Sequence, residues 1–143
     1  MDKSVAICIF NKKGELLLQR RAENDDSYPL CFDFSAAGGI ERGESKDTAA
    51  TRELREELGI ETTLRYVSTY VYTAEGEGDI LEIYKGLYDG PFRPNPAEVQ
   101  EVVFCSLDEI SRKVERGEQF HPEFLSVFRD ENLLSLILRP TQF

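Results

Sequence analysis

The stretch GGIERGESKDTAATRELREELGIE, which runs from Gly38 to Glu61, decides how this chain is interpreted. Its second half predicts a helix from Lys46 to Leu58, because Ser45 is a favourable N-cap residue and Gly59 is a typical C-terminal stop. Three glutamates stand in this helix at positions 53, 56 and 57. Carboxylates spaced i, i+3 and i+4 share one helical face, and each like-charge pair there costs a few tenths of a kcal/mol. The repulsion among these three glutamates must be offset by a partner that lies outside the helix.

The position of the glutamates on the helix allows two interpretations. On a wheel of 100° per residue, Glu57 lies about 40° and Glu56 about −60° from Glu53, at the border of an apolar stripe. A solvated acidic face is the common reason for such a charge run. The alternative is a site for Mg²⁺ or Mn²⁺, which prefers oxygen ligands and few carboxylates. Spacing alone leaves both interpretations open.

Composition limits the class of protein. With 143 residues, 41% of them hydrophobic, we expect a single globular domain spanning residues 1–143. The net charge of −10 argues against a nucleic acid polymer as partner, because no basic stripe is present. No apolar run is long enough to span a bilayer, so we expect no membrane partner. The three cysteines include no Cys-x-x-Cys pair, and we expect a reducing, cytoplasmic location.

The pattern of apolar runs and turns predicts a mixed α/β domain. Beyond the helix at 46–58, we expect helices in LDEISRKVERG and, one or two in number, in HPEFLSVFRDENLLSLIL. A short strand is also expected in CFDFSAA, just before the two glycines. The longer strands are expected at Val5–Phe10, Glu15–Arg21, Thr62–Thr73, Ile80–Tyr88 and Val99–Ser106.

The loop and the helix together match a known motif. Gly38, five residues, Glu44, seven residues and then RELREELGI agree with the Nudix box, G-x5-E-x7-R-E-U-x-E-E-x-G-U, at all nine specified positions. The chain therefore resembles the Nudix hydrolases over these 23 residues and in the coarse order of its elements. The resemblance implies a Nudix-type α/β/α sandwich, with a mixed sheet and a catalytic Nudix helix.

The resemblance also implies a chemistry. Nudix hydrolases cleave a diphosphate linked to another moiety, X, with a divalent metal and water. Carried over by position, the metal ligands are the backbone carbonyl of Ala37 and the side chains of Glu53, Glu56 and Glu57. Arg52 and Glu44 resemble the pair that orients the catalytic helix. The implied cofactor is Mg²⁺, with Mn²⁺ as a substitute, and the implied partner is a small phosphorylated substrate.

Residues outside the glutamate cluster complete the expected site. The general base is one of the box glutamates or an acid outside the box. In AEVQEVVF, Glu98 and Glu101 are the outside candidates, and we prefer Glu101; a solvent-facing position in the strand stays open for both. Arg20 and Arg21 are candidates for binding the substrate phosphates, together with the backbone at Gly38 and Gly39; a structural surface role stays open for both arginines. Five aromatic residues could stack on a base, although packing is the more common role of such residues: Phe32, Phe34, Tyr70, Tyr72 and Tyr84.

A narrower resemblance concerns the branch of the family. The segments LLLQRRAENDDSYPLCFDFSAAGG, EVQEVVFCSLDEI and FHPEFLSVF are similar to Nudix proteins related to isopentenyl diphosphate isomerase. That isomerase needs a cysteine just before the box glycine and a metal site largely of histidines. Here Ala37 stands in that position, and the single histidine, His121, is expected to begin a helix.

Several functions therefore remain open. We expect hydrolysis of a nucleoside di- or triphosphate, then of a nucleotide sugar or a prenyl diphosphate. An isomerase-like enzyme and a catalytically silent nucleotide-binding module are the alternatives. Nudix domains are often dimers, so the resemblance also allows a homodimer.

Overall fold

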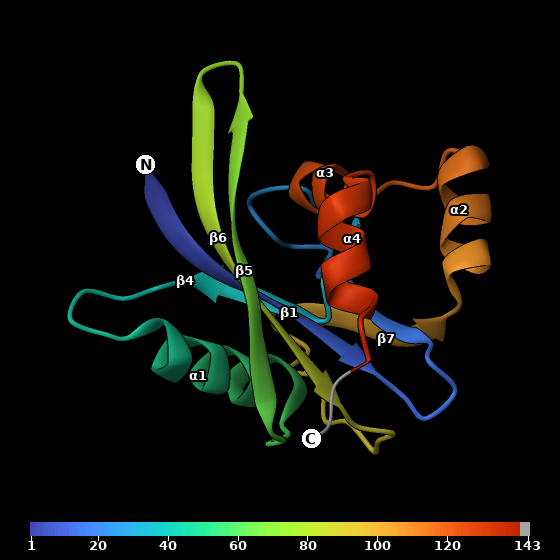
Figure 1. Ribbon diagram of the computed structural model, residues 1–143, viewed down its shortest axis with the longest axis horizontal. Coiled ribbons are helices and arrows are strands. Elements are labelled where there is room, and N and C mark those ends of the chain that lie inside the picture. The colour runs from blue at the N-terminus through green and yellow to red at the C-terminus, as the bar shows by residue number, and fades with distance from the viewer. Residues whose placement is uncertain (141–143) are drawn as a thin grey trace.

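A mixed seven-stranded sheet forms the middle layer of the computed structural model, which describes residues 1–140 (Figure 1). Five strands follow the order β3-β2-β1-β6-β5, while β4 pairs with β1 and β7 pairs with β2. The strands are β1 (Asp2–Phe10), β2 (Leu16–Arg21), β3 (Phe32–Asp33), β4 (Ala36–Gly39), β5 (Leu64–Ala74), β6 (Glu77–Leu87) and β7 (Val99–Cys105). The helices are α1 (Lys46–Leu58), α2 (Leu107–Glu115), α3 (Pro122–Phe128) and α4 (Glu131–Leu138).

Helices cover both faces of the sheet, which confirms the predicted α/β/α sandwich (Figure 1). Successive residues of a strand point to opposite faces, and β1 divides its side chains accordingly. Val5, Ile7 and Ile9 pack in the cluster that contains Leu54 and Leu58 of α1. Ala6 and Cys8 pack in the other cluster, which contains buried residues of α2, α3 and α4.

The central helix forms as its sequence predicts. Ser45 caps the N-terminus of α1, where its Oγ accepts the N–H of Thr48 at 3.1 Å. Gly59 ends the helix in the left-handed region, with φ of 66°, and its N–H donates to Arg55 O at 3.0 Å. These local interactions fix both ends of α1.

The other predictions hold with shifted boundaries. The segment CFDFSAA forms two short strands, β3 and β4, in place of one. Two helices close the described chain, and His121 is the N-cap residue of α3 as expected. Cys8, Cys31 and Cys105 are all buried and unpaired. Within residues 1–140, no helix has the length and apolarity needed to cross a membrane.

Strands β2 and β4 pair with different parts of β1. Strand β4 lies antiparallel to Ser4–Ile7, with Val5 opposite Gly38, whereas β2 meets β1 only where Phe10 faces Leu16. Side chains link β2 to the segment before β4: Gln19 Nε2 donates to Ser35 O at 3.1 Å, and Ser35 Oγ donates to Leu17 O at 2.6 Å. This arrangement places Gln19, Gly38 and α1 around one hollow of the surface.

Candidate active site

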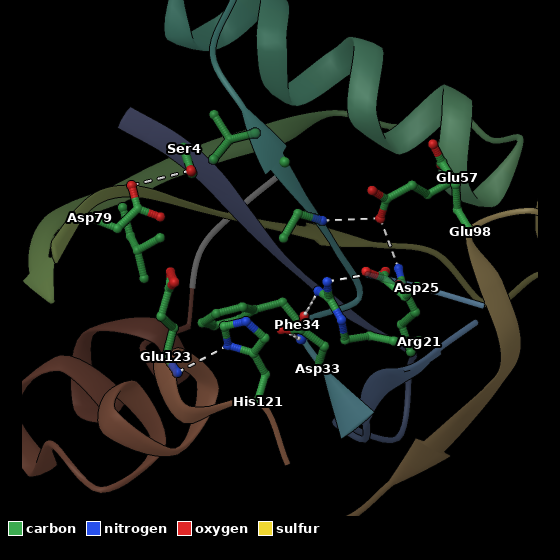
Figure 2. A pocket seen from close by; sticks show the side chains of 15 residues that line it. Ser4, Arg21, Asp25, Asp33, Phe34, Glu57, Asp79, Glu98, His121 and Glu123 are labelled. Carbon is green, nitrogen blue, oxygen red and sulfur yellow. Dashed lines mark hydrogen bonds and ion pairs between the residues drawn. The ribbon is translucent and has the colours of Figure 1, made fainter. Parts of the chain in front are cut away.

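A cavity of about 270 Å³ lies beside α1, over the strands that surround β1 (Figure 2). Glu57, Glu98 and Arg21 line one end of it, and Ser4, Asp79 and Glu123 line the other. Its other lining residues are Val5, Gln19, Asp25, Asp33, Phe34, Ala37, Gly38, Leu81 and His121. Six carboxyl groups therefore face one small space, which indicates a site for a cation or for hydrogen-bond donors.

Glu53 and Glu57 form a buried pair of carboxyl groups on α1. Their residues are 8% and 7% exposed, and their carboxyl groups lie close to each other. Glu57 Oε1 also accepts Gln19 Nε2 at 2.8 Å and the N–H of Ala37 at 3.1 Å. Burial raises the pKa of Glu57 well above its ordinary value, and the proximity of Glu53 adds to the effect. A bound cation would favour the ionised form of these carboxyl groups.

Gly38 allows the loop before α1 to approach this pair. A Cβ on residue 38 would lie 2.2 Å from Glu53 Oε1, far inside the van der Waals limit. Glycine is thus required by the carboxylate of Glu53, and not by a left-handed backbone. Gly39 is exposed, lies outside the cavity lining, and has open space around its Cα.

Arg52 connects the loop to the helix. Its Nε and Nη2 donate to the two carboxylate oxygens of Glu44 at 2.7 and 2.9 Å, and Nη2 also donates to Gly39 O at 2.9 Å. Nη1 donates to Glu53 Oε1 at 2.8 Å. The hydrogen bonds from Arg52 and from the N–H of Glu41 lower the pKa of Glu44 to about 2. The predicted pairing of Arg52 with Glu44 is present, in the bidentate geometry that Arg favours.

Glu56 is the exposed member of the three glutamates and shares Arg52 Nη1 with Glu53. Its side chain is 47% exposed, and its Oε2 accepts Arg52 Nη1 at 3.2 Å. Within residues 1–140, no three Asp, Glu, His or Cys side chains converge closely enough to hold a metal ion by themselves. The oxygen donors of Glu53, Glu57 and the backbone at Ala37 nevertheless fit Mg²⁺, which binds one or two carboxylates and completes its shell with waters and phosphates.

The two candidate arginines occupy different places. Arg21 lines the cavity, where its Nη1 lies 2.9 Å from Asp33 Oδ2 and its Nη2 lies 3.1 Å from Asp25 Oδ2. Arg20 lies outside the cavity lining: its Nε donates to Leu30 O, and its guanidinium stacks over the Phe32 ring. Of the two, only Arg21 is placed to meet a ligand beside Glu57.

The two candidate bases are also separated. Glu98 is exposed but lines the cavity, and its pKa is raised by desolvation and by the negative charges of Glu53 and Glu56. Glu101 is exposed outside the cavity lining, with its Oε2 at 3.7 Å from Arg20 Nη1. The geometry therefore favours Glu98 over Glu101, the residue preferred on the sequence alone.

Several buried polar residues carry no motif that the sequence analysis could use. Gln19 and Asp33 are 5% and 4% exposed; Gln19 follows the apolar residues Leu16–Leu18 of β2, and Asp33 lies between Phe32 and Phe34. Their apolar neighbours were the available signal, because a polar residue buried among them needs a partner. Asp79 and Glu123 belong to no motif. Of the five candidate aromatics, only Phe34 lines this cavity, while Phe32 and Tyr84 are buried in the core.

Comparisons with known proteins agree with the fold and the motif. Residues 2–128 match the NUDIX domain. The chain is 32% identical to an isopentenyl-diphosphate Delta-isomerase of Serratia proteamaculans (strain 568), over 91% of this chain and 76% of that protein. It is 36% identical to an uncharacterized Nudix hydrolase of Listeria monocytogenes, over 84% of this chain and 72% of that protein.

A solved structure supports the same assignment at the level of the fold. The crystal structure of DR0079 from Deinococcus radiodurans matches with a TM-score of 0.80 and 21% identity, over 90% of this chain and 81% of that one. The chain belongs to the Nudix family, in the branch that includes proteins named isopentenyl-diphosphate isomerase, and it is a Nudix pyrophosphohydrolase.

Proposed function

We propose that the protein hydrolyses a diphosphate linked to a nucleoside, with a nucleoside di- or triphosphate as the first candidate substrate and Mg²⁺ as the cofactor. The observation that carries the proposal is the buried Glu53–Glu57 pair, of which Glu57 opens into the cavity. Glu53, Glu56 and Glu57 would hold the ion together with the carbonyl of Ala37. Mn²⁺ is the expected substitute, because it takes the same oxygen ligands.

The bound ion would neutralise the diphosphate and lower the pKa of a water molecule. Gln19 and the N–H of Ala37 hold the carboxylate of Glu57 in place, and the Arg52–Glu44 pair holds the loop against α1. Glu98 would take the proton from the attacking water, and its raised pKa brings it closer to the range of an efficient base. Arg21 would exchange part of its contact with Asp25 or Asp33 for a phosphate oxygen.

Isomerase activity is the second candidate, because relatives carry that name. It requires a cysteine beside the box glycine, where this chain has Ala37. Cys31 is buried outside the cavity lining, and its Sγ contacts Gln119 Oε1 at 3.9 Å. The donor set is carboxylate, and the single histidine, His121, lies at the cavity wall as a helix cap. These features favour hydrolysis.

A silent binding module would be expected to have lost box acids, whereas all of them are present here. A cytoplasmic location belongs to the same proposal, since the three cysteines are unpaired as in a reducing compartment. A homodimer is proposed from the family alone, and light scattering of the purified protein would test it.

A turnover screen tests the proposed function. Purified protein with Mg²⁺ is given nucleoside di- and triphosphates, nucleotide sugars, dinucleotides and isopentenyl diphosphate, and the products are separated by chromatography. Wild type should release phosphate or pyrophosphate from a nucleotide, and chelation of the metal should abolish the reaction. Isomerised product without phosphate release would establish the second candidate. Silence of a folded protein across the panel would contradict both activities.

A further inference from the structure

The far end of the cavity holds a second pair of carboxyl groups, Asp79 on β6 and Glu123 on α3 (Figure 2). Ser4 Oγ donates to Asp79 Oδ1 at 3.2 Å, and Glu123 lines the same end of the cavity close to Asp79. Two neighbouring carboxyl groups disfavour ionisation of both, because like charges repel. Burial, and then the contact with Asp79, raise the pKa of Glu123 to about 8. At neutral pH the pair thus offers one donor and several acceptor oxygens.

The fold makes little use of the Glu123 side chain. The backbone N–H of Glu123 donates to Nδ1 of His121 at 3.1 Å, so the start of α3 is capped without the carboxyl group. A partly buried carboxyl group that must stay protonated lowers the stability of the folded state at neutral pH. A ligand that receives hydrogen bonds from the pair, or donates to it, would account for its presence.

An anionic ligand does not suit this end of the cavity. Among the described lining residues, Arg21 is the one Lys or Arg side chain, and it is paired with Asp25 and Asp33. An apolar ligand does not suit it either, because it would displace water from the carboxylate of Asp79 without replacing the hydrogen bonds. An uncharged group that carries N–H or O–H donors fits.

Asp79 and Glu123 lie where the group X would be if its diphosphate were bound at Gly38. Val5 pairs with Gly38 and Asp2 pairs with Asp79, so the two points are three residues apart on β1, roughly 10 Å along the strand. Beyond the pair lies a second, more open hollow of about 490 Å³, which shares Asp79 and Glu123 with the first and includes Tyr72. A diphosphate at Gly38 would therefore direct X toward the pair, with room beyond it.

We propose that Asp79 and Glu123 select the group X: they hydrogen-bond an uncharged X that carries N–H or O–H donors, and they exclude an anionic or a prenyl X. A nucleobase and a sugar share this chemistry. The proposal rests on the proposed function, because it assigns the selectivity of the same cavity. A site built to hydrogen-bond its ligand rejects an analogue without the matching groups, because its own polar atoms are left unpaired.

Matched substrates test the proposal with Mg²⁺-loaded protein. GTP is compared with ITP, which lacks one amino group, and UDP-glucose with UDP-glucuronate, which adds a carboxylate; isopentenyl diphosphate represents the prenyl class. The variants are Asp79→Asn and Glu123→Gln. Asp108→Asn and Glu115→Gln are the charge-matched controls, because both residues are exposed on α2, outside the two hollows.

Wild type should prefer the first member of a pair by about tenfold in kcat/KM, the effect of one hydrogen bond to a charged group. Asp79→Asn should reduce this preference to within about threefold, mainly through KM, and the controls should retain it. If the variant changes the preference between GTP and ITP, the group that contacts Asp79 and Glu123 is a nucleobase. If it changes the preference between UDP-glucose and UDP-glucuronate, that group is a sugar. A preference that is absent, or that both cavity variants keep in full, would overturn the proposal while hydrolysis itself stands.

Binding separates the failure of this proposal from failure of the proposed function. Amide NMR shifts are recorded with UDP-glucose and with a methylene-bridged GTP analogue. In one outcome, no substrate is hydrolysed, and the amide signals of Asp79 and Glu123 shift in wild type but not in Asp79→Asn. This result would support the proposed selectivity and refute the proposed hydrolase activity. Absence of shifts at these amides, with no hydrolysis, overturns both.

Discussion

Gly38 and Glu53 occupy the same small space: the carboxylate of Glu53 lies where a side chain on residue 38 would begin, with Oε1 2.2 Å and Cδ 2.3 Å from the position that a Cβ would take. The glycine therefore lets the loop before α1 close over a buried acid. Because Arg52 holds both Glu53 and the carbonyl of Gly39, loop and helix form one rigid unit. That unit is what positions the proposed metal ligands.

Replacing this glycine should separate activity from stability. In Gly38→Ala the Glu53 side chain must swing aside, which costs roughly 1 kcal/mol of unfolding free energy. The displaced carboxylate should lower kcat about 100-fold, because small misplacements at a reacting centre have effects of that size. Urea unfolding and steady-state kinetics measure the two effects. Gly39→Ala is the stability control, since nothing lies within 4 Å of its Cβ position. Unchanged kcat in Gly38→Ala would contradict the role of Glu53.

Removing one charge from the buried pair should stabilise the metal-free protein. In Glu57→Gln the amide can donate to Glu53 while its oxygen keeps the bonds from Gln19 and Ala37. We expect a gain of about 1 kcal/mol in chelator. Added Mg²⁺ should raise the Tm of wild type and leave that of the variant unchanged, because binding to the native state alone stabilises it. Equal Mg²⁺ shifts in both proteins would place the ion elsewhere.

Glu44 should contribute stability that depends on pH. Its pKa of about 2 lies below the ordinary value of 4.5, so the native state favours the ionised form. The stabilisation is full above about pH 4.5 and is lost as the pH falls toward 2. Glu44→Gln should therefore lower the Tm by a few degrees at pH 7, and the difference should shrink toward pH 2. Glu61→Gln is the control, because the Arg55–Glu61 pair is exposed and should matter little.

The two candidate bases can be separated by kinetics. Glu98→Gln should lower kcat by about 100-fold, the smaller end of the usual effect of a general base. It should also remove the acidic limb of the pH–kcat profile. Glu101→Gln should change kcat less than twofold, since its carboxylate faces Arg20 outside the cavity. A large effect of Glu101→Gln together with a small one of Glu98→Gln would restore the interpretation made from the sequence.

Glu123 should make the protein less stable as the pH rises. Its pKa is about 8 in the folded state against 4.5, so the native state binds the proton more tightly than the unfolded chain. The stability that this provides is full below about pH 4.5 and is lost as the pH rises through 8. The charged groups acting on it are Asp79, Asp33 and Arg21, with His121 beside it. Glu123→Gln should flatten the Tm profile between pH 5 and pH 8; an unchanged slope would contradict the raised pKa of Glu123.

The part of the site that lies on α1 was predictable because its determinants are local. Ser45 and Gly59 fix the ends of the helix, and the spacing of Glu53 and Glu57 fixes their common face. The metal-ligand role of the three glutamates stays a prediction; Arg52 Nη1 donates to both Glu53 and Glu56, and Glu56 is the more exposed of the two. The contact of Arg52 with Glu56 follows from their i,i+4 spacing, whereas its contacts with Glu44 and with the carbonyl of Gly39 depend on the loop before α1.

The residues contributed by the strands were harder to predict. A register shift between Arg20 and Arg21 sets Arg20 opposite Glu101 and Arg21 opposite Val99, and neighbouring strand residues face opposite sides. One arginine thus enters the cavity and the other leaves it, which no composition pattern reveals. Asp79 of β6 and Glu123 of α3 meet only because both elements contribute to the wall of one cavity, so their proximity depends on the complete fold.

A calorimetric titration of Mg²⁺ into wild type and Glu57→Gln, each with and without a nucleoside diphosphate, tests whether Glu53 and Glu57 hold the metal. We predict a saturable binding event in wild type, strengthened by the nucleotide, and at least tenfold weaker in the variant, as expected when a metal ligand is lost. No binding in wild type under either condition, or equal affinity in the two proteins, would contradict the assignment of Glu53 and Glu57 as the metal site.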